Sequence, residues 1–113
     1  MNVKQLIQQI RLRPGMYVGI PTLESIHLFI SGFLYNNIMT GRADYVDSAF
    51  KKQFHSWVRN ELEEKNGMKF TKEQNYVFYI NQAFPDAEQR INAFFELCNR
   101  FFREIDSSIE KKY

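Results

Sequence analysis

Apolar residues recur at helical spacing along most of this chain. Over residues 2–12 they come every three or four positions, which predicts an amphipathic helix. Those positions are Val3, Leu6, Ile7 and Ile10. We expect this helix to end before Pro14, because a proline disfavours helical geometry in the residue that precedes it. Residues 14–21 contain two prolines and two glycines, so we expect a shaped loop there and not a further helix.

Two longer helices are predicted next. Thr22 is a suitable N-cap for a helix over residues 23–40, and Asp44 or Asp47 caps a third helix that runs to about residue 65. The 23–40 helix is apolar on more than one side, so we expect a central helix that several neighbours cover, with Gly32 at a close helix crossing. Its apolar positions are Leu23, Ile26, Ile30, Phe33, Leu34 and Ile38, widened by Leu28, Phe29 and Tyr35.

The segment over residues 72–84 is compatible with either a helix or a strand. The run from Tyr76 to Ile80 is β-branched and aromatic, as in a strand, but it also keeps helical spacing. We favour a helix, because the chain offers no second convincing strand and a lone strand would leave its backbone groups without partners. Thr71 with Gln74 three residues later resembles a capping box at its start.

The last predicted helix covers residues 87–106 after a cap at Asp86, and residues 106–113 are expected to fray. The single cysteine, Cys98, lies on the apolar stripe of this helix, so we expect a buried thiol and no internal disulfide. The patterns together predict one all-α domain over residues 1–113. It has four or five helices and a Pro- and Gly-rich loop after the first.

Charge and composition exclude several classes of function. Fifteen Lys and Arg residues against thirteen Asp and Glu give a net charge of +2, which provides no strong field for binding nucleic acid or a membrane surface. No run reaches the roughly 18 apolar residues of a membrane span, and the first residues lack the apolar core of a signal peptide. We therefore expect a cytoplasmic protein. Aromatic residues make up 16% of the chain, more than a core of this size needs, so some are expected at an interaction surface or a homodimer interface.

The sequence offers little for catalysis. His27 and His55 lie on different predicted helices, and neither has a second metal ligand at helical spacing on its own helix. A nucleophilic Cys98 would need exposure and a histidine partner, which its apolar neighbours argue against. We therefore predict no enzymatic activity, no metal site and no cofactor.

One short segment carries most of the functional information. Its candidate partner-binding residues are Arg11, Arg13, Pro14, Gly15, Met16, Tyr17 and Gly19. Prolines stiffen the segment, which lowers the entropy lost on docking, and Met, Tyr and Arg are enriched at interfaces. Two other interpretations stay open. The segment could bind an anion before a helix N-terminus, or Met16 and Tyr17 could simply pack between the first two helices.

The residues of this segment, IRLRPGMYVG from Ile10 to Gly19, resemble the RPGMYIG signature in the ATPase domain of gyrase B-subunits and type IIA topoisomerases. The resemblance implies a nucleotide- or gyrase-related module. The chain has no D-x-G-x-G box after the segment and is too short for the α/β sandwich of those ATPases. The expectation is therefore a non-catalytic module.

The layout of the whole chain is similar to that of small uncharacterised bacterial proteins encoded near secreted polymorphic toxins. The shared features are the first amphipathic helix, the RPGMYxG loop, the helix that begins near Ser25, and a Phe-rich last helix. The resemblance implies an immunity protein that binds and neutralises a cognate toxin. Our leading hypothesis is therefore a protein-binding protein of the immunity type. The alternatives are the gyrase-related module and a homodimeric regulatory or scaffold protein.

Overall fold

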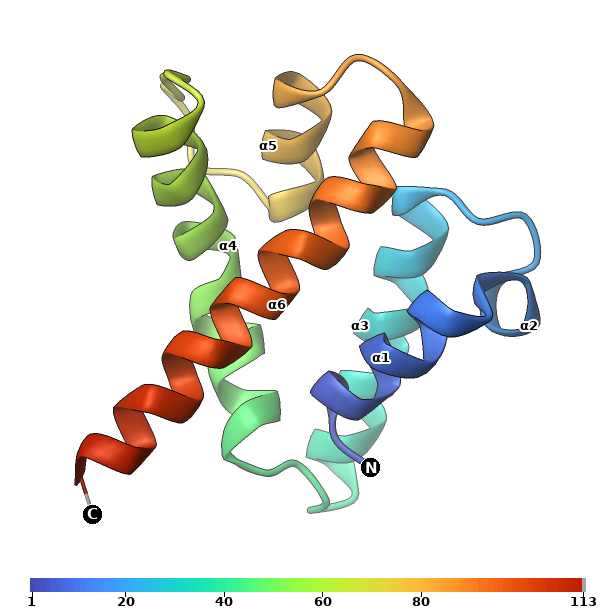
Figure 1. The fold of residues 1–113 in the computed structure, drawn as a ribbon. Helices are drawn as coiled ribbons and strands as arrows, with labels where there is room; N and C mark the ends of the chain where they lie inside the picture. The colour runs from blue at the N-terminus through green and yellow to red at the C-terminus, as the bar shows by residue number, and fades with distance from the viewer. Residues whose placement is uncertain (113) are drawn as a thin grey trace.

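The helices that the periodicity predicts all form. The computed structural model describes the backbone of residues 1–112 and the side chains of residues 1–108. Within that range it contains six helices and no strand (Figure 1). They are α1 (Val3–Leu12), α2 (Pro14–Val18), α3 (Leu23–Met39), α4 (Tyr45–Lys65), α5 (Tyr76–Ala83) and α6 (Ala87–Lys112). The all-α prediction is confirmed, and the helix preferred over a strand within residues 72–84 is α5.

Polar side chains at the helix starts explain where the helices begin. Capping boxes start α1 at Asn2, α3 at Thr22 and α4 at Asp44, and each satisfies backbone N–H groups that the helix itself leaves free. The start of α5 differs from the prediction. Its N-cap is Asn75, whose side chain accepts a hydrogen bond from the Phe78 N–H, and not Thr71.

Helix α6 crosses the molecule and contacts α1, α3, α4 and α5 (Figure 1). Aromatic rings from α4, α5 and α6 itself pack together and form the centre of the core. Phe54, Tyr76, Phe94 and Phe101 are fully buried there. Cys98 is also fully buried, as predicted, and burial raises the pKa of its thiol well above the usual value. Helix α6 continues past its predicted end at residue 106 to Lys112, and residue 113 lies outside the described residues.

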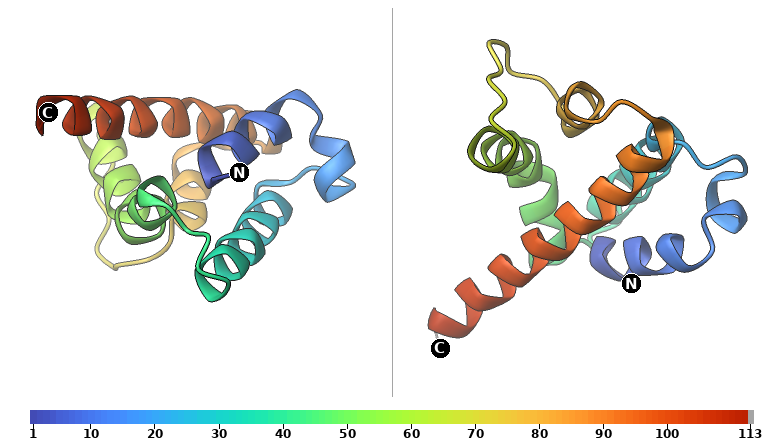
Figure 2. Two further views of the ribbon diagram at one scale, coloured as in Figure 1. Left: turned by 90° about the horizontal axis from the view of Figure 1, so that it is seen from below. Right: turned by 45° about the horizontal axis from the view of Figure 1, so that its top comes forward.

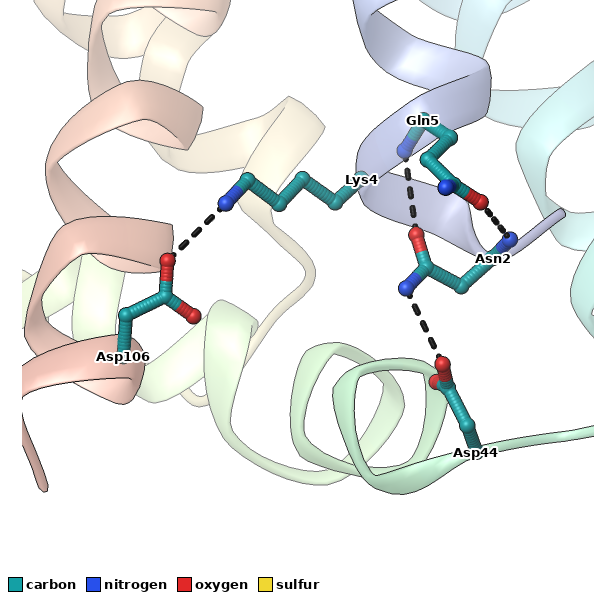
Figure 3. Close-up of polar contacts among 5 residues, drawn as sticks. All are labelled: Asn2, Lys4, Gln5, Asp44 and Asp106. Atoms are coloured by element: carbon teal, nitrogen blue, oxygen red, sulfur yellow. Dashed lines mark hydrogen bonds and ion pairs between the residues drawn. The ribbon is translucent and has the colours of Figure 1, made fainter. Parts of the chain in front are cut away.

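The first turn of α1 is joined to two other helices by polar side chains (Figure 3). The Asn2 amide donates to the Asp44 carboxylate at the start of α4, and the Lys4 ammonium pairs with Asp106 of α6 at 2.9 Å. Behind these contacts, the buried carboxylate of Asp47 accepts a hydrogen bond of 2.6 Å from the Val3 backbone N–H. This junction fixes α1 against α4 and α6.

Three further predictions about local structure are wrong. Residues 14–18, predicted as a loop, form the short helix α2, because a proline is favoured at the first position of a helix even though it ends the one before. The covering expected around α3 is incomplete, because Leu28 and Tyr35 are 70% and 67% exposed. Gly32 lies on this open side, where a Cβ atom would meet nothing within 4 Å, so it permits no close helix crossing.

Within the described residues, no helix is both long enough and apolar enough to cross a membrane.

Candidate functional site

The predicted partner-binding segment forms an outer corner of the molecule. Helix α2 packs mainly against its sequence neighbours α1 and α3, and it stands at the edge of the fold in every view (Figures 1 and 2). Pro14 begins it, and Gly19 ends it with a φ of 70°, a left-handed value that favours glycine. The segment is therefore a rigid turn that projects from the helical body.

The side chains of this segment divide between packing and exposure. Tyr17 is half-buried, and its ring meets the Phe29 ring of α3 edge-on at 5.8 Å. Met16 is 73% exposed, and Arg13 and Gly15 are exposed beside it. Arg11 lies 5.7 Å over the ring of Phe95 on α6. Tyr17 thus packs against α3, as the alternative interpretation expected, whereas Met16 stays free for contact.

The sequence analysis missed how far the apolar surface around α2 extends. Most of the large apolar residues that remain exposed lie between the end of α1 and the end of α3. We call this set the α2–α3 surface, and it consists of Leu12, Met16, Ile20, Leu28, Phe29, Tyr35, Ile38 and Met39. Helix α3 carries a single charged residue, Glu24, and it also exposes the polar residues Ser31 and Asn36. Large exposed apolar patches are typical of interaction sites.

A second feature that the sequence did not predict is a pair of histidines around one tyrosine. His27 of α3 and His55 of α4 both contact Tyr76 of α5. The His27 Nδ1 lies 2.7 Å from the Tyr76 hydroxyl, and the His55 Nδ1 accepts a hydrogen bond of 3.0 Å from the Tyr76 backbone N–H. The His55 ring also stacks on the Tyr76 ring, with centroids 5.2 Å apart. Tyr76 therefore fixes the position of both imidazoles.

These hydrogen bonds determine which ring nitrogen carries the proton. The His55 Nδ1 is an acceptor, so in the neutral ring the proton is on Nε2. We assign the Tyr76 hydroxyl as the donor to His27 Nδ1, which likewise leaves the His27 proton on Nε2. Burial keeps the phenol neutral, because it raises the pKa of Tyr76 well above 10.0. Both histidines therefore offer an Nε2–H donor.

The two histidines line a pocket of about 220 Å³ between α3, α4 and α5. We call it the histidine pocket. Its apolar lining consists of Ile30, Leu34, Tyr35, Ile38, Phe50 and Tyr76, and its polar lining of His27, Ser31, Lys51 and His55. Two imidazoles do not complete a metal centre. Among residues 1–108, no group of three or more His, Cys, Asp or Glu side chains converges as a metal site.

The state of the two histidines predicts how stability depends on pH. Burial lowers the pKa of His27 below 6.5, and burial, followed by the charge of His27, lowers the pKa of His55. Below pH 6.5 the unfolded chain therefore binds more protons than the folded one, so stability falls as the pH drops toward the lowered values. We expect a lower urea midpoint at about pH 5.5 than at about pH 7.5.

The control for this prediction is the double variant His27→Gln, His55→Gln. It lacks both imidazoles, so its urea midpoint should change much less over the same pH interval, which lies above the range where most carboxylates titrate. A wild-type midpoint that is equal or higher at the lower pH would contradict the assigned neutral state.

Comparisons with protein-family models, curated proteins and solved structures find no match to this chain. Within residues 1–112 the structure contains helices and no strand.

Proposed function

We propose that this protein binds another protein through the α2–α3 surface. The observation that carries the proposal is the gathering of exposed Met, Ile, Leu, Phe and Tyr side chains on α3 and the projecting turn before it. Aromatic residues and methionine are enriched at protein interfaces, and the rigid turn lowers the entropy lost on docking. By contrast, α5 exposes only one large apolar residue, Phe78, and to a lesser degree.

The charges around this surface favour an acidic partner. Arg13 lies on the α2 side, Arg42 follows the end of α3, and Lys51 lines the pocket beside α3. None of the three forms an ion pair with a carboxylate of residues 1–108. A partner with an apolar patch between acidic groups would satisfy these cations.

A second copy of this chain fits the surface less well. An isologous dimer places the same patch on both sides, so the cations of one copy would face those of the other across a two-fold axis. Like charges brought together across an interface disfavour binding. The homodimeric scaffold is therefore the weaker alternative.

In its specific form, the proposal is a cytoplasmic immunity protein that neutralises a cognate toxin by stoichiometric binding. The resemblance in layout to small bacterial proteins encoded near polymorphic toxins supports this form. So does the surface chemistry, because an inhibitor needs an apolar patch that docks and a set of charges that steers the partner. Such a protein acts by covering its partner and needs no reacting groups of its own.

Co-expression with the product of the neighbouring gene tests this function. We expect a one-to-one complex and rescue from toxicity. The double variant Met16→Asp, Ile20→Asp should weaken the complex about 30-fold or more, because it places two carboxylates in an apolar interface that already faces acidic groups. The two residues are 73% and 85% exposed, so the fold should tolerate both changes. Binding is measured by calorimetry on the purified pair.

The control is Phe78→Asp, which places one carboxylate, the charge that each of the two changes adds, on an exposed apolar position of α5, outside the α2–α3 surface. It should leave the affinity unchanged. Absence of a complex with the neighbouring product would refute the immunity form. An equal loss in both variants would refute the assigned surface. A dimer seen by light scattering that the Met16 and Ile20 changes dissociate would identify a second copy as the occupant.

A further inference from the structure

The histidine pocket contains an unusual combination of groups. Its polar lining comes from two histidines, whose protons are assigned to Nε2, from Lys51 and from Ser31. The first three of these are hydrogen-bond donors in the state assigned above. No carboxylate lines the pocket. A group that enters it must therefore supply acceptor oxygens.

The two imidazoles are held in place before any ligand arrives. Tyr76 uses its hydroxyl for His27 Nδ1 and its backbone N–H for His55 Nδ1, so both rings are fixed by a residue that is only 1% exposed. The remaining nitrogen of each ring has no partner among residues 1–108, and Lys51 forms no ion pair there. Preorganised donors without internal partners are typical of a binding site and cost little entropy when they bind.

The apolar lining and the volume limit the size of the ligand. Aliphatic side chains of α3 and the rings of Phe50 and Tyr76 surround the interior. An apolar cavity of about 150 Å³ holds one benzene molecule. The histidine pocket, at about 220 Å³, has room for one aromatic ring and a small polar group.

We propose that the histidine pocket binds a small aromatic carboxylate, a single ring that carries one carboxylate group. The ring packs against Ile30, Leu34 and Phe50, and the carboxylate accepts hydrogen bonds from the imidazole Nε2–H groups and pairs with Lys51. Charge-assisted hydrogen bonds of this kind are about twice as strong as neutral ones. The pocket shares Tyr35, Ile38 and Lys51 with the proposed protein-binding surface, but binding of a small ligand requires no partner protein, so it can be tested on the purified chain alone.

Calorimetry on the full chain with phenylacetate as the probe tests the proposal. We expect saturable one-to-one binding, about tenfold weaker binding of phenylacetamide, and no binding of phenethylamine, because the amide lacks the charge and the amine has the wrong sign. In NMR spectra, the imidazole Cε1–H signals of both His27 and His55 should shift during the titration. Absence of saturable binding, or equal affinity for phenylacetate and its amide, would overturn the proposal.

Three variants assign the binding to this pocket. Lys51→Met should weaken phenylacetate binding about fivefold. Lys52→Met removes the neighbouring cation, which does not line the pocket, and should have no effect. Ser31→Trp fills the pocket from an exposed position of α3 and should abolish binding while the thermal melting temperature stays close to that of the wild type. Equal effects of the two lysine changes, or unchanged binding in Ser31→Trp, would place the ligand elsewhere and overturn the proposal.

Discussion

Replacing Asp47 with alanine is expected to lower the free energy of unfolding by about 3 kcal/mol. The carboxylate is fully buried and accepts hydrogen bonds from the Val3 N–H, the Asn37 amide and the Asp44 N–H. It thereby joins the starts of α1 and α4 to the end of α3. Alanine leaves these donors without a partner in a site closed to water, and each such group costs about 1–3 kcal/mol. Urea denaturation followed by circular dichroism measures the loss.

The matched control is Asp106→Ala, which removes a carboxylate of α6 that contacts the same end of α1. Asp106 pairs with Lys4, but its side chain is 44% exposed, so water replaces the lost contact (Figure 3). We expect a loss below about 1 kcal/mol. If both variants lost a similar free energy of unfolding, burial of the Asp47 carboxylate would not determine how much it contributes to stability.

The starts of α3 and α4 are predicted correctly because their causes are local. Thr22 and Ser25 bond to each other, as do Asp44 and Asp47, and each pair is three residues apart. A cap of this kind can be recognised from a few letters of sequence. Thr71 and Gln74 have the same spacing but do not start a helix, because Asn75 caps α5 one turn later.

The proline that begins α2 is a local sequence signal with two possible meanings. A proline ends the helix before it and is also favoured at the first position of the next one. The sequence analysis used only the first meaning at Pro14 and expected a loop. The glycine at residue 19 ends α2 with a φ of 70°, a value that favours glycine.

The exposed side of α3 was beyond prediction for a different reason. A helix that is apolar on all sides gives no indication of which side its neighbours cover. Leu28 and Tyr35 have the same character as the buried Ile26 and Ile30, and only the placement of α1, α5 and α6 separates them. This is also why the α2–α3 surface could be recognised only in the folded chain.

The histidine pair depends on contacts between distant segments. His27 is 49 residues from Tyr76, and His55 is 21 residues from it. No spacing rule connects such positions, since helix packing brings them together. The sequence signal that existed was weak: each histidine lies on a helix with apolar positions around it, and the tyrosine is in an apolar run.

Tyr76→Ala is expected to lower the free energy of unfolding by about 4 kcal/mol, the largest effect that we predict. The Tyr76 ring packs against Phe50, Phe54 and Phe94 in the core and also contacts both imidazoles. Alanine would open a cavity beneath these rings and remove the hydroxyl that fixes His27. The effect on stability is read from urea denaturation, and the loss of imidazole order from the Cε1–H signals in NMR spectra.

Two further variants separate the roles of the ring and the hydroxyl. Tyr76→Phe keeps the ring and the backbone N–H, so it should cost about 1 kcal/mol, release only His27 and leave the His55 signal in place. Phe78→Ala removes an aromatic ring from the same helix at a position that is 38% exposed, so it should also cost about 1 kcal/mol. If Tyr76→Phe destabilised the protein as much as Tyr76→Ala, the hydroxyl and not the packed ring would make the main contribution of Tyr76 to stability. In that case the hydrogen bond to His27, and not the aromatic core, would hold α5 against α3.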